Sequence, residues 1–319
     1  MLIDSNIKEW RKLGLLYSCD GKGSGFFKSH SMRVVPLKLP SGNIRLFYSS
    51  RCEQDMMHPT FLDVSGSDLF KILHVNDSPL LKVGEPGLFD DSGITIGSIS
   101  KINNEYFVYY TGWKRRRYGV SFELSIGVAK LNDDLKTMTK LSKGPIIGQN
   151  INNPYLVGGP FVIQSEDNTF CMYYCSANNW VQYDHGPEPI YSIYRAESRD
   201  GLAWDTSNNS QLIPFEFEGE VISAPWVCKF QDLTKIYYCY RGSNDKLAKQ
   251  YKIGSAITFD GKSWKRTDKI KGLEKGFGDW DNEMMCYPAL FHHRKKLYMF
   301  YSGNGVGKGG FGLAEAVFE

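Results

Sequence analysis

The chain has almost no excess of charge of either sign and no long apolar run. Its 38 lysine and arginine residues nearly balance 35 aspartate and glutamate residues, giving a net charge of +3 over 319 residues. This balance disfavours binding of nucleic acid through bulk electrostatics. No run approaches the roughly 20 apolar residues of a membrane span, and residues 1–6 lack the basic and apolar regions of a secretory signal. We therefore expect a cytoplasmic protein without a nucleic-acid partner or a membrane span.

The cysteines lack the spacing of a metal site or a disulfide framework. Their number is seven, which is odd, and no C-x-x-C pair or cysteine–histidine cluster with zinc spacing occurs. Five of them lie in apolar, strand-like runs: Cys171, Cys175, Cys228, Cys239 and Cys286. We expect reduced, buried thiols, and no cofactor motif is apparent.

Aromatic residues, in contrast, are abundant and recur in a repeat. A short run that ends in an aromatic pair and a small or polar residue occurs five times, and its aligned tyrosines are 62, 64, 66 and 61 residues apart: Tyr48, Tyr110, Tyr174, Tyr240 and Tyr301. A constant period indicates repeated supersecondary units, and this length fits one four-stranded propeller blade. The repeat predicts an all-β fold, a single five-bladed β-propeller domain over residues 1–319 with four antiparallel strands per blade.

Further strand-like runs surround each aromatic run. A run precedes it at 32–37, 94–99, 159–163, 224–228 and 287–291, and a third strand follows at 125–129, 192–196, 253–257 and 310–314. Two Asp-Gly turns precede Trp204 and Trp264, which we expect to pack between blades. The last unit ends after its third strand. Residues 9–16 are therefore predicted to add the missing strand and close the ring, which removes exposed strand edges.

Acidic residues recur where the first strands of three blades begin. First strands line the channel of a propeller, so these positions point to a central funnel. A lone aspartate before a strand is more often a turn former, but converging carboxylates suit glycosidic bond cleavage, in which one is protonated and another is charged. The predicted catalytic residues are Asp90, Asp91, Glu220, Asp281 and Glu283.

Cationic, aromatic and amide residues occupy other positions expected at the funnel. Tryptophan faces stack on sugar rings, and arginine binds carboxylates or phosphates in bidentate fashion. Residues 114–117 could equally form a solvated loop, and 180–188 is a longer insertion, a candidate lid or specificity loop. The predicted substrate-binding residues are His30, Arg33, Arg51, Trp113, Arg115, Asn153, Tyr155, Trp180, Glu188, Arg241, Tyr287 and Asn304.

The chain resembles the five-bladed propeller glycosidase superfamily of arabinanase/xylosidase-like enzymes, invertase-like enzymes and mannoside phosphorylases. The resemblance spans essentially the whole chain and is carried by residues 198–204, the repeated Tyr-Tyr strands and residues 298–305. It implies one inner-strand acid in each of three blades: Asp90 or Asp91, Glu220 as proton donor, and Asp281 or Glu283. A structural Ca²⁺ at the base of the funnel would also fit the superfamily, although no ligand set can be assigned.

The first blade departs from the pattern of the superfamily. Residues 29–33 read Ser-His-Ser-Met-Arg and contain no acid. Arg33 is similar to the phosphorylase branch, in which an arginine helps to bind an anion. The phosphorylase-type Glu-Asp-Pro-Arg is also missing, since Phe-Asp-Asp-Ser stands at 89–92.

The sequence therefore predicts a carbohydrate-active, glycoside hydrolase-like enzyme that cleaves or transfers a glycosyl unit of an acidic or phosphorylated sugar. Its expected ligand is a carbohydrate, a sugar phosphate or a sugar nucleotide. Two alternatives remain open. One is a glycosyltransferase of surface-polysaccharide assembly, with the donor held by Arg33, Arg51 and Arg241. The other is a non-catalytic glycan-binding propeller that uses Trp113 and Trp180.

Overall fold

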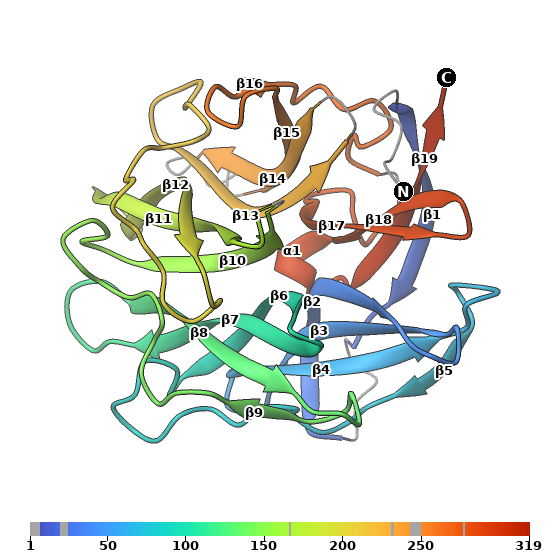
Figure 1. The fold of residues 1–319 in the computed structure, drawn as a ribbon, viewed down its shortest axis with the longest axis horizontal. Coiled ribbons are helices and arrows are strands. Elements are labelled where there is room, and N and C mark those ends of the chain that lie inside the picture. The colour runs from blue at the N-terminus through green and yellow to red at the C-terminus, as the bar shows by residue number, and fades with distance from the viewer. Residues whose placement is uncertain (1–6, 20–24, 166, 231–232, 243–249, 277) are drawn as a thin grey trace.

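The strands form five antiparallel sheets arranged around one axis (Figure 1). The computed structural model describes residues 7–19, 25–165, 167–230, 233–242, 250–276 and 278–319. In order of pairing, the first two blades consist of β2 (Phe27–Lys38), β3 (Ile44–Cys52), β4 (Met57–Val64) and β5 (Ile72–Val75), then β6 (Gly93–Ile102), β7 (Glu105–Arg115), β8 (Phe122–Leu131) and β9 (Met138–Lys140).

The third and fourth blades differ in their outermost strand. The third has three strands, and one isolated bridge between Glu197 and Asp205 stands in place of a fourth. The strands of these blades are β10 (Val157–Gln164), β11 (Phe170–Tyr183) and β12 (Gly186–Ser198), then β13 (Glu220–Lys229), β14 (Thr234–Gly242), β15 (Lys252–Thr258) and β16 (Lys265–Arg266).

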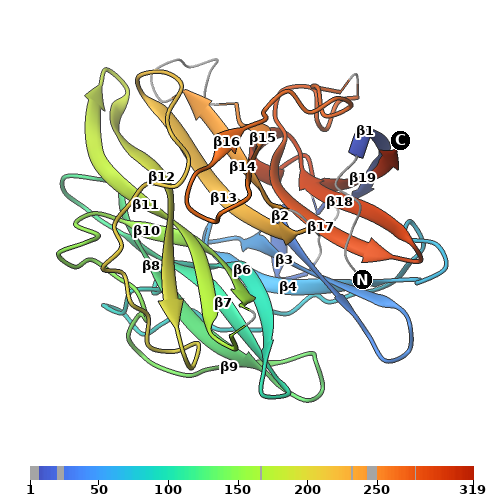
Figure 2. The same ribbon diagram turned by 45° about the horizontal axis from the view of Figure 1, so that its top comes forward.

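The fifth blade closes the ring with the N-terminal strand. It contains β17 (Cys286–His293), β18 (Lys296–Ser302) and β19 (Phe311–Phe318), and β1 (Ile7–Tyr17) pairs with β19. The tilted view shows β1 beside β19 at the edge of this sheet (Figure 2). The five-bladed propeller and its closure are thus confirmed. Only α1 (Asn304–Gly307), one irregular turn, is assigned as α-helix in the described ranges, and none of these ranges contains a helix able to cross a membrane.

Aromatic packing joins the blades to one another. The Trp204 ring meets Tyr109 of the second blade edge-on at 5.9 Å, and the Trp264 ring meets Tyr173 of the third blade at 6.4 Å. Both tryptophans therefore pack between blades as predicted. In the fourth blade the aligned tyrosine is Tyr238 rather than Tyr240: its side chain is fully buried, like those of Tyr48, Tyr110, Tyr174 and Tyr301. The spacing then becomes 62, 64, 64 and 63 residues.

Each innermost strand has a β-bulge at a corresponding place. The register breaks after Met32, Ile96, Gly158, Ser223 and Cys286. In four blades a residue with positive φ stands there: Arg33, Gly159, Ala224 and Tyr287, with φ of 58°, 65°, 53° and 56°. A bulge redirects a side chain relative to the regular pleat, so these positions can face the axis of the ring.

A ring of hydrogen bonds fixes these bulges. Four bulge N–H groups donate to side chains of the preceding blade, namely Ser302, Thr111, Cys175 and Cys239. In the second blade Ile96 donates to Ser49 in the same way. Proline follows the bulge residue in three blades, at positions 160, 225 and 288. Proline inside a strand is typical of a bulge.

Candidate functional site

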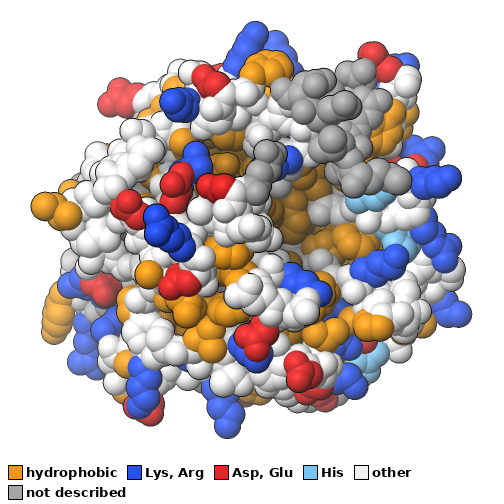
Figure 3. All heavy atoms as spheres, viewed as in Figure 1, with side chains coloured by type: hydrophobic (Ala, Val, Ile, Leu, Met, Phe, Trp, Pro, Cys, Tyr) orange, Lys and Arg blue, Asp and Glu red, His pale blue; other side chains and the backbone are white. Residues whose placement is uncertain are grey.

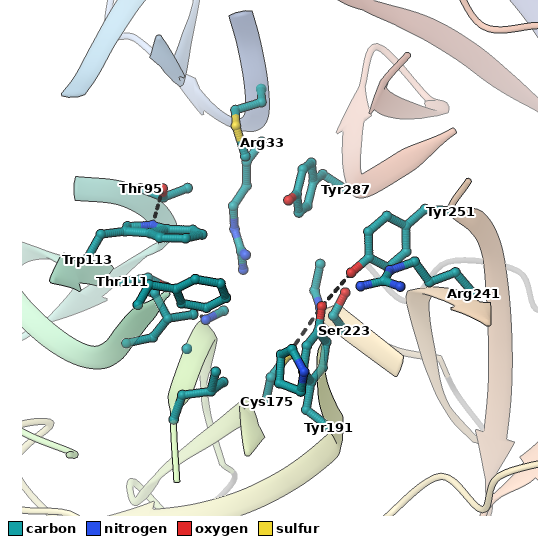
Figure 4. Close-up of a pocket in the computed structure, with 18 of the residues that line it drawn as sticks. Arg33, Thr95, Thr111, Trp113, Cys175, Tyr191, Ser223, Arg241, Tyr251 and Tyr287 are labelled. Atoms are coloured by element: carbon teal, nitrogen blue, oxygen red, sulfur yellow. Dashed lines mark hydrogen bonds between the residues drawn. The ribbon is translucent and has the colours of Figure 1, made fainter. Parts of the chain in front are cut away.

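A cavity of about 250 Å³ lies where the five blades meet, and its lining includes residues from every blade. The space-filling view along the direction of Figure 1 shows this face hollowed near its middle, with hydrophobic side chains in the hollow (Figure 3). In the close-up of the cavity, Arg33 points between Trp113 on one side and Tyr191 and Tyr251 on the other (Figure 4).

Arg33 is a buried cation on the β2 bulge that faces this cavity. It is only 8% exposed. Its guanidinium lies 5.7 Å from the Tyr287 ring and close to Gly159, where a Cβ would come within 3.3 Å of Nη1. Over the described part of the chain, no carboxylate forms an ion pair with Arg33. Burial lowers the pKa of its guanidinium, and the charges that oppose this effect come from Tyr287, Cys175 and Cys239.

Arg241, the second cation of the cavity, forms an ion pair with a carboxylate. Its Nη2 lies 3.3 Å from Oε2 of Glu188, and its guanidinium lies 5.2 Å from the Tyr251 ring. Burial by itself would lower the pKa of Arg241, but Tyr251, Tyr191 and Glu188 outweigh it and raise the pKa, so the guanidinium stays charged. The hydroxyls of Tyr191 and Tyr251 are 2.5 Å apart. This side of the cavity therefore offers paired charges and phenolic hydroxyls.

The opposite side of the cavity is apolar. It consists of Trp113 on β7, Phe122 and Leu124 on β8, and Leu156 just before β10. The Trp113 and Phe122 rings are 5.2 Å apart. The indole N–H of Trp113 already donates to Oγ1 of Thr95 at 2.9 Å, so the indole offers only its ring to a ligand.

Five of the predicted substrate-binding residues line this cavity: Arg33, Trp113, Glu188, Arg241 and Tyr287. The sequence interpretation missed other lining residues, among them Thr95, Thr111, Cys175, Tyr191, Ser223 and Tyr251. Some of these had a usable signal. Thr111 directly follows the aligned Tyr110, and Tyr191 and Tyr251 both stand just before the third strand predicted for their blades.

The predicted catalytic carboxylates do not line the cavity. Asp90, Glu220 and Asp281 are instead buried between strands of their own blades. Asp90 accepts a hydrogen bond from Tyr110 and pairs with Lys140 at 2.5 Å. Asp281 accepts one from Tyr301 and pairs with Lys12 at 2.9 Å.

Glu220 follows the same plan. Its two oxygens accept bidentate hydrogen bonds of 2.8 Å from Arg266, which also pairs with Asp268, and Asp268 accepts from Tyr238. The cation comes from the outermost strand in each of these blades: β9 supplies Lys140, β16 supplies Arg266 and β1 supplies Lys12. The recurrence of acids in three blades thus corresponds to a repeated ion pair inside the scaffold.

The remaining carboxylates belong to loops. Asp91 accepts from the backbone N–H of Gly87 and from the Ser92 hydroxyl, as a turn former does. Glu283 is exposed. Its backbone N–H donates to Asn304, whose amide also donates to the carbonyl of Asp279. Asn304 therefore fastens two loops together outside the cavity lining.

The other predicted binding residues also lie outside the cavity lining. Arg51 and Arg115 both pair with Asp55. The Asn153 side chain is buried and accepts from Tyr174, while His30 contacts the Ser29 hydroxyl. Tyr155 is half-buried, and Trp180 packs against Phe122, behind the apolar side of the cavity. Within the described ranges, no group of three or more His, Cys, Asp or Glu side chains is arranged to hold a metal ion.

Sequence comparison connects the chain to one family. No model of a known protein family matches it. Over 306 residues, 96% of this chain and 98% of the relative, it is 30% identical to "Uncharacterized protein Rv1502" of Mycobacterium tuberculosis strain H37Rv. The chain belongs to this family. "Uncharacterized protein MT1551" of strain CDC 1551 matches with the same identity and coverage.

Solved structures share the fold at low sequence identity. A structure named "Glycoside hydrolase" matches with a TM-score of 0.70 and 14% identity over 98% of this chain and 91% of that chain. A structure titled as showing that the GH130 family of mannoside phosphorylases contains glycoside hydrolases for beta-1,2 mannosidic linkages in Candida mannan matches with a TM-score of 0.72 and 15% identity, over 99% and 95% of the two chains. A thermostable family-43 glycoside hydrolase has a TM-score of 0.68 and 15% identity, over 95% and 94%. The predicted resemblance to five-bladed propeller glycosidases is thus confirmed for the fold.

Proposed function

We propose that this protein is a carbohydrate-active enzyme that transfers a glycosyl unit from a sugar whose leaving group is a phosphate, and that Arg33 binds this phosphate. The observation that carries the proposal is the buried Arg33, which faces the cavity and has no anionic partner among the described residues. A buried charge is costly unless it is paired. A phosphate supplies that charge and accepts two hydrogen bonds from one guanidinium.

The charges of the cavity favour transfer over hydrolysis by two carboxylates. Hydrolysis needs a carboxylic acid to protonate the leaving oxygen and a second carboxylate on the other side of the sugar. Glu188 is the one carboxylate in the cavity lining as far as the chain is described. A departing phosphate is stable as an anion near neutral pH. A positioned cation can therefore stabilise the leaving group in place of a general acid that protonates it.

The reaction then needs a single base. The bond between the anomeric carbon and the phosphate oxygen breaks, and its electron pair leaves with the phosphate on Arg33. An acceptor hydroxyl oxygen forms the new bond to the anomeric carbon and gives its proton to Glu188. Arg241 holds Glu188 in place at 3.3 Å. The volume of about 250 Å³ is below the range of drug-sized pockets. It therefore suits one sugar unit with its phosphate, with the acceptor entering from the open side.

The test compares phosphorylated and neutral ligands on the purified protein. Isothermal titration calorimetry measures binding of sugar 1-phosphates, nucleotide sugars and the corresponding free sugars, and a phosphate-release assay with and without acceptor sugars measures transfer. Arg33→Gln should weaken binding of the phosphorylated ligands about 100-fold, because it removes one partner of a buried charge pair. The matched control is Arg199→Gln, at an exposed position outside the cavity lining.

The opposite result is equally clear. If neutral glycosides are hydrolysed at the same rate by the wild type and Arg33→Gln, and no phosphorylated sugar binds, the proposal is wrong. Hydrolysis would then have to use carboxylates that lie outside the described lining of the cavity.

A further inference from the structure

The two sides of the cavity differ in polarity, and this difference bears on the sugar. Resting on the proposed function, we infer that the bound sugar carries a methyl-ended substituent, as an N-acetyl group or a 6-deoxy carbon provides. This methyl packs against the apolar side of the cavity, formed by Trp113, Phe122, Leu124 and Leu156.

The apolar side offers little to a hydroxyl group. Leu124 lies directly across from Trp113 in the pairing of β7 with β8, and Phe122 stands two residues before it. The four side chains of this side have no polar atom to offer, because the one N–H among them, that of the Trp113 indole, already donates to Thr95. A hydroxyl turned toward Leu124 and Leu156 would lose water without gaining an equivalent partner, which is unfavourable. A methyl group in the same place removes apolar surface from water.

The rest of the cavity fixes the direction in which the sugar lies. Arg33 holds the phosphate, and the hydroxyls of Tyr191 and Tyr251 stand across from Trp113 (Figure 4). Sugar hydroxyls therefore find partners on the side of Tyr191 and Tyr251, together with the Arg241 and Glu188 pair. The phosphate thus faces Arg33 and the hydroxyls face the two tyrosines. The remaining substituent then faces Phe122 and Leu124, which are only partly buried and can contact a ligand.

The experiment uses sugar 1-phosphates that differ in one substituent. N-acetylated, 6-deoxy and fully hydroxylated hexose 1-phosphates, each in the gluco, galacto and manno configurations, are titrated calorimetrically into the wild-type protein. The methyl-bearing member of a pair should bind about tenfold more tightly, the discrimination expected for one apolar group in an apolar pocket.

Two variants and a control assign this preference to the apolar side. Leu124→Asn should bring the affinity ratio of each pair close to one, because its amide can serve a hydroxyl. Leu124→Ala, which adds no polar group, should reduce the ratio without reversing it and covers the case in which the asparagine variant does not fold. The control Leu202→Asn makes the same change at an exposed leucine in the third blade and should keep the wild-type ratio.

The outcomes separate this inference from the proposed function. If both members of each pair bind equally well, and Arg33→Gln weakens both, the inference is wrong while the phosphate site stands. If the methyl-bearing member binds more tightly but the ratio is unchanged in both Leu124 variants, the apolar side does not select the substituent and the inference is also wrong. If no sugar 1-phosphate binds in any configuration, the proposed function and the inference fall together.

Discussion

The acid sites inside the blades and the cavity at the axis balance their charges in opposite ways. Asp90, Glu220 and Asp281 each meet a cation from the outermost strand of their own blade. Arg33, at the axis, is buried as these acids are but meets no carboxylate among the described residues. Each acid is thus balanced within its own blade, whereas the charge of Arg33 is the one that we propose a phosphate balances.

This difference shows how repetition and function separate in a propeller. The acids that recur in three blades have the same structural role in each: they are buried and form an ion pair within their own blade. The bulge position, in contrast, holds Arg33, Gly159, Ala224 and Tyr287 in four blades. Glycine at position 159 leaves room for the arginine, since a Cβ there would lie 3.3 Å from its Nη1. The bulge position, which differs from blade to blade, therefore carries the arginine of the proposed site.

The largest expected effect comes from breaking one of the acid sites. Glu220→Gln removes the charge that Arg266 meets through two hydrogen bonds of 2.8 Å in a fully buried setting. Arg266 keeps Asp268 as a second partner, so the loss in the free energy of unfolding should lie at the lower end for a buried pair, about 3 kcal/mol. Urea denaturation followed by tryptophan fluorescence measures this loss.

A neighbouring residue provides the control for this prediction. Glu218 is exposed and stands two residues away, so Glu218→Gln should change the free energy of unfolding by less than about 0.5 kcal/mol. Sugar 1-phosphate affinity of the folded Glu220→Gln protein should match that of the wild type. A stable Glu220→Gln protein that has lost its ligand affinity would place Glu220 in the binding site and contradict the comparison.

The sequence predicted the fold more completely than it predicted the site. Five aromatic runs at a regular period were enough to predict the ring of blades. The missing last strand was enough to predict that residues 9–16 close it. The positions of Asp90, Glu220 and Asp281 before the inner strands were also readable. The direction in which these side chains point could not be predicted, because a side chain at the start of a strand can face either the axis or its own blade. Only the contacts with Tyr110 and Tyr301 decide between the two.

The sequence predicted those cavity residues whose side-chain type differs from that of the surrounding repeat. Arg33 stands out as a cation between Met32 and Val34, whereas Tyr191 and Tyr251 are hidden among 19 tyrosines. The bulges explain part of this difficulty. An extra residue in each inner strand changes which side chains face the axis, and the prolines at 160, 225 and 288 mark it in only three blades.

A smaller effect should distinguish the fifth blade, in which the aligned tyrosine donates to a carboxylate, from the third, in which it donates to an amide. The Tyr301 hydroxyl donates to the charged Asp281, whereas the Tyr174 hydroxyl donates to the amide of Asn153. Hydrogen bonds to charged groups contribute more than neutral ones. Tyr301→Phe should therefore lower the free energy of unfolding by about 2 kcal/mol, and Tyr174→Phe by about 1 kcal/mol. Equal losses in urea denaturation would mean that the two blades do not differ in this respect.

The smallest expected effect is the most informative about the cavity. Arg33→Met removes a buried cation that has no anionic partner in the described structure, so the free energy of unfolding should change by less than about 1 kcal/mol or increase. Arg45→Met is the matched control. Arg45 is also buried, but it makes two hydrogen bonds of 2.7 Å to Asp63, and its loss should lower the free energy of unfolding by about 3 kcal/mol.

Saturating sugar 1-phosphate should then separate these two proteins further. A ligand that binds only the folded state stabilises it in proportion to the logarithm of its affinity, so thermal unfolding should shift upward for the Arg45→Met protein and stay in place for the Arg33→Met protein. If Arg33→Met is as destabilising as Arg45→Met without ligand, Arg33 is a structural cation of the scaffold, and the contrast between blades and cavity disappears. If the ligand shifts both variants equally, the phosphate binds elsewhere than on Arg33.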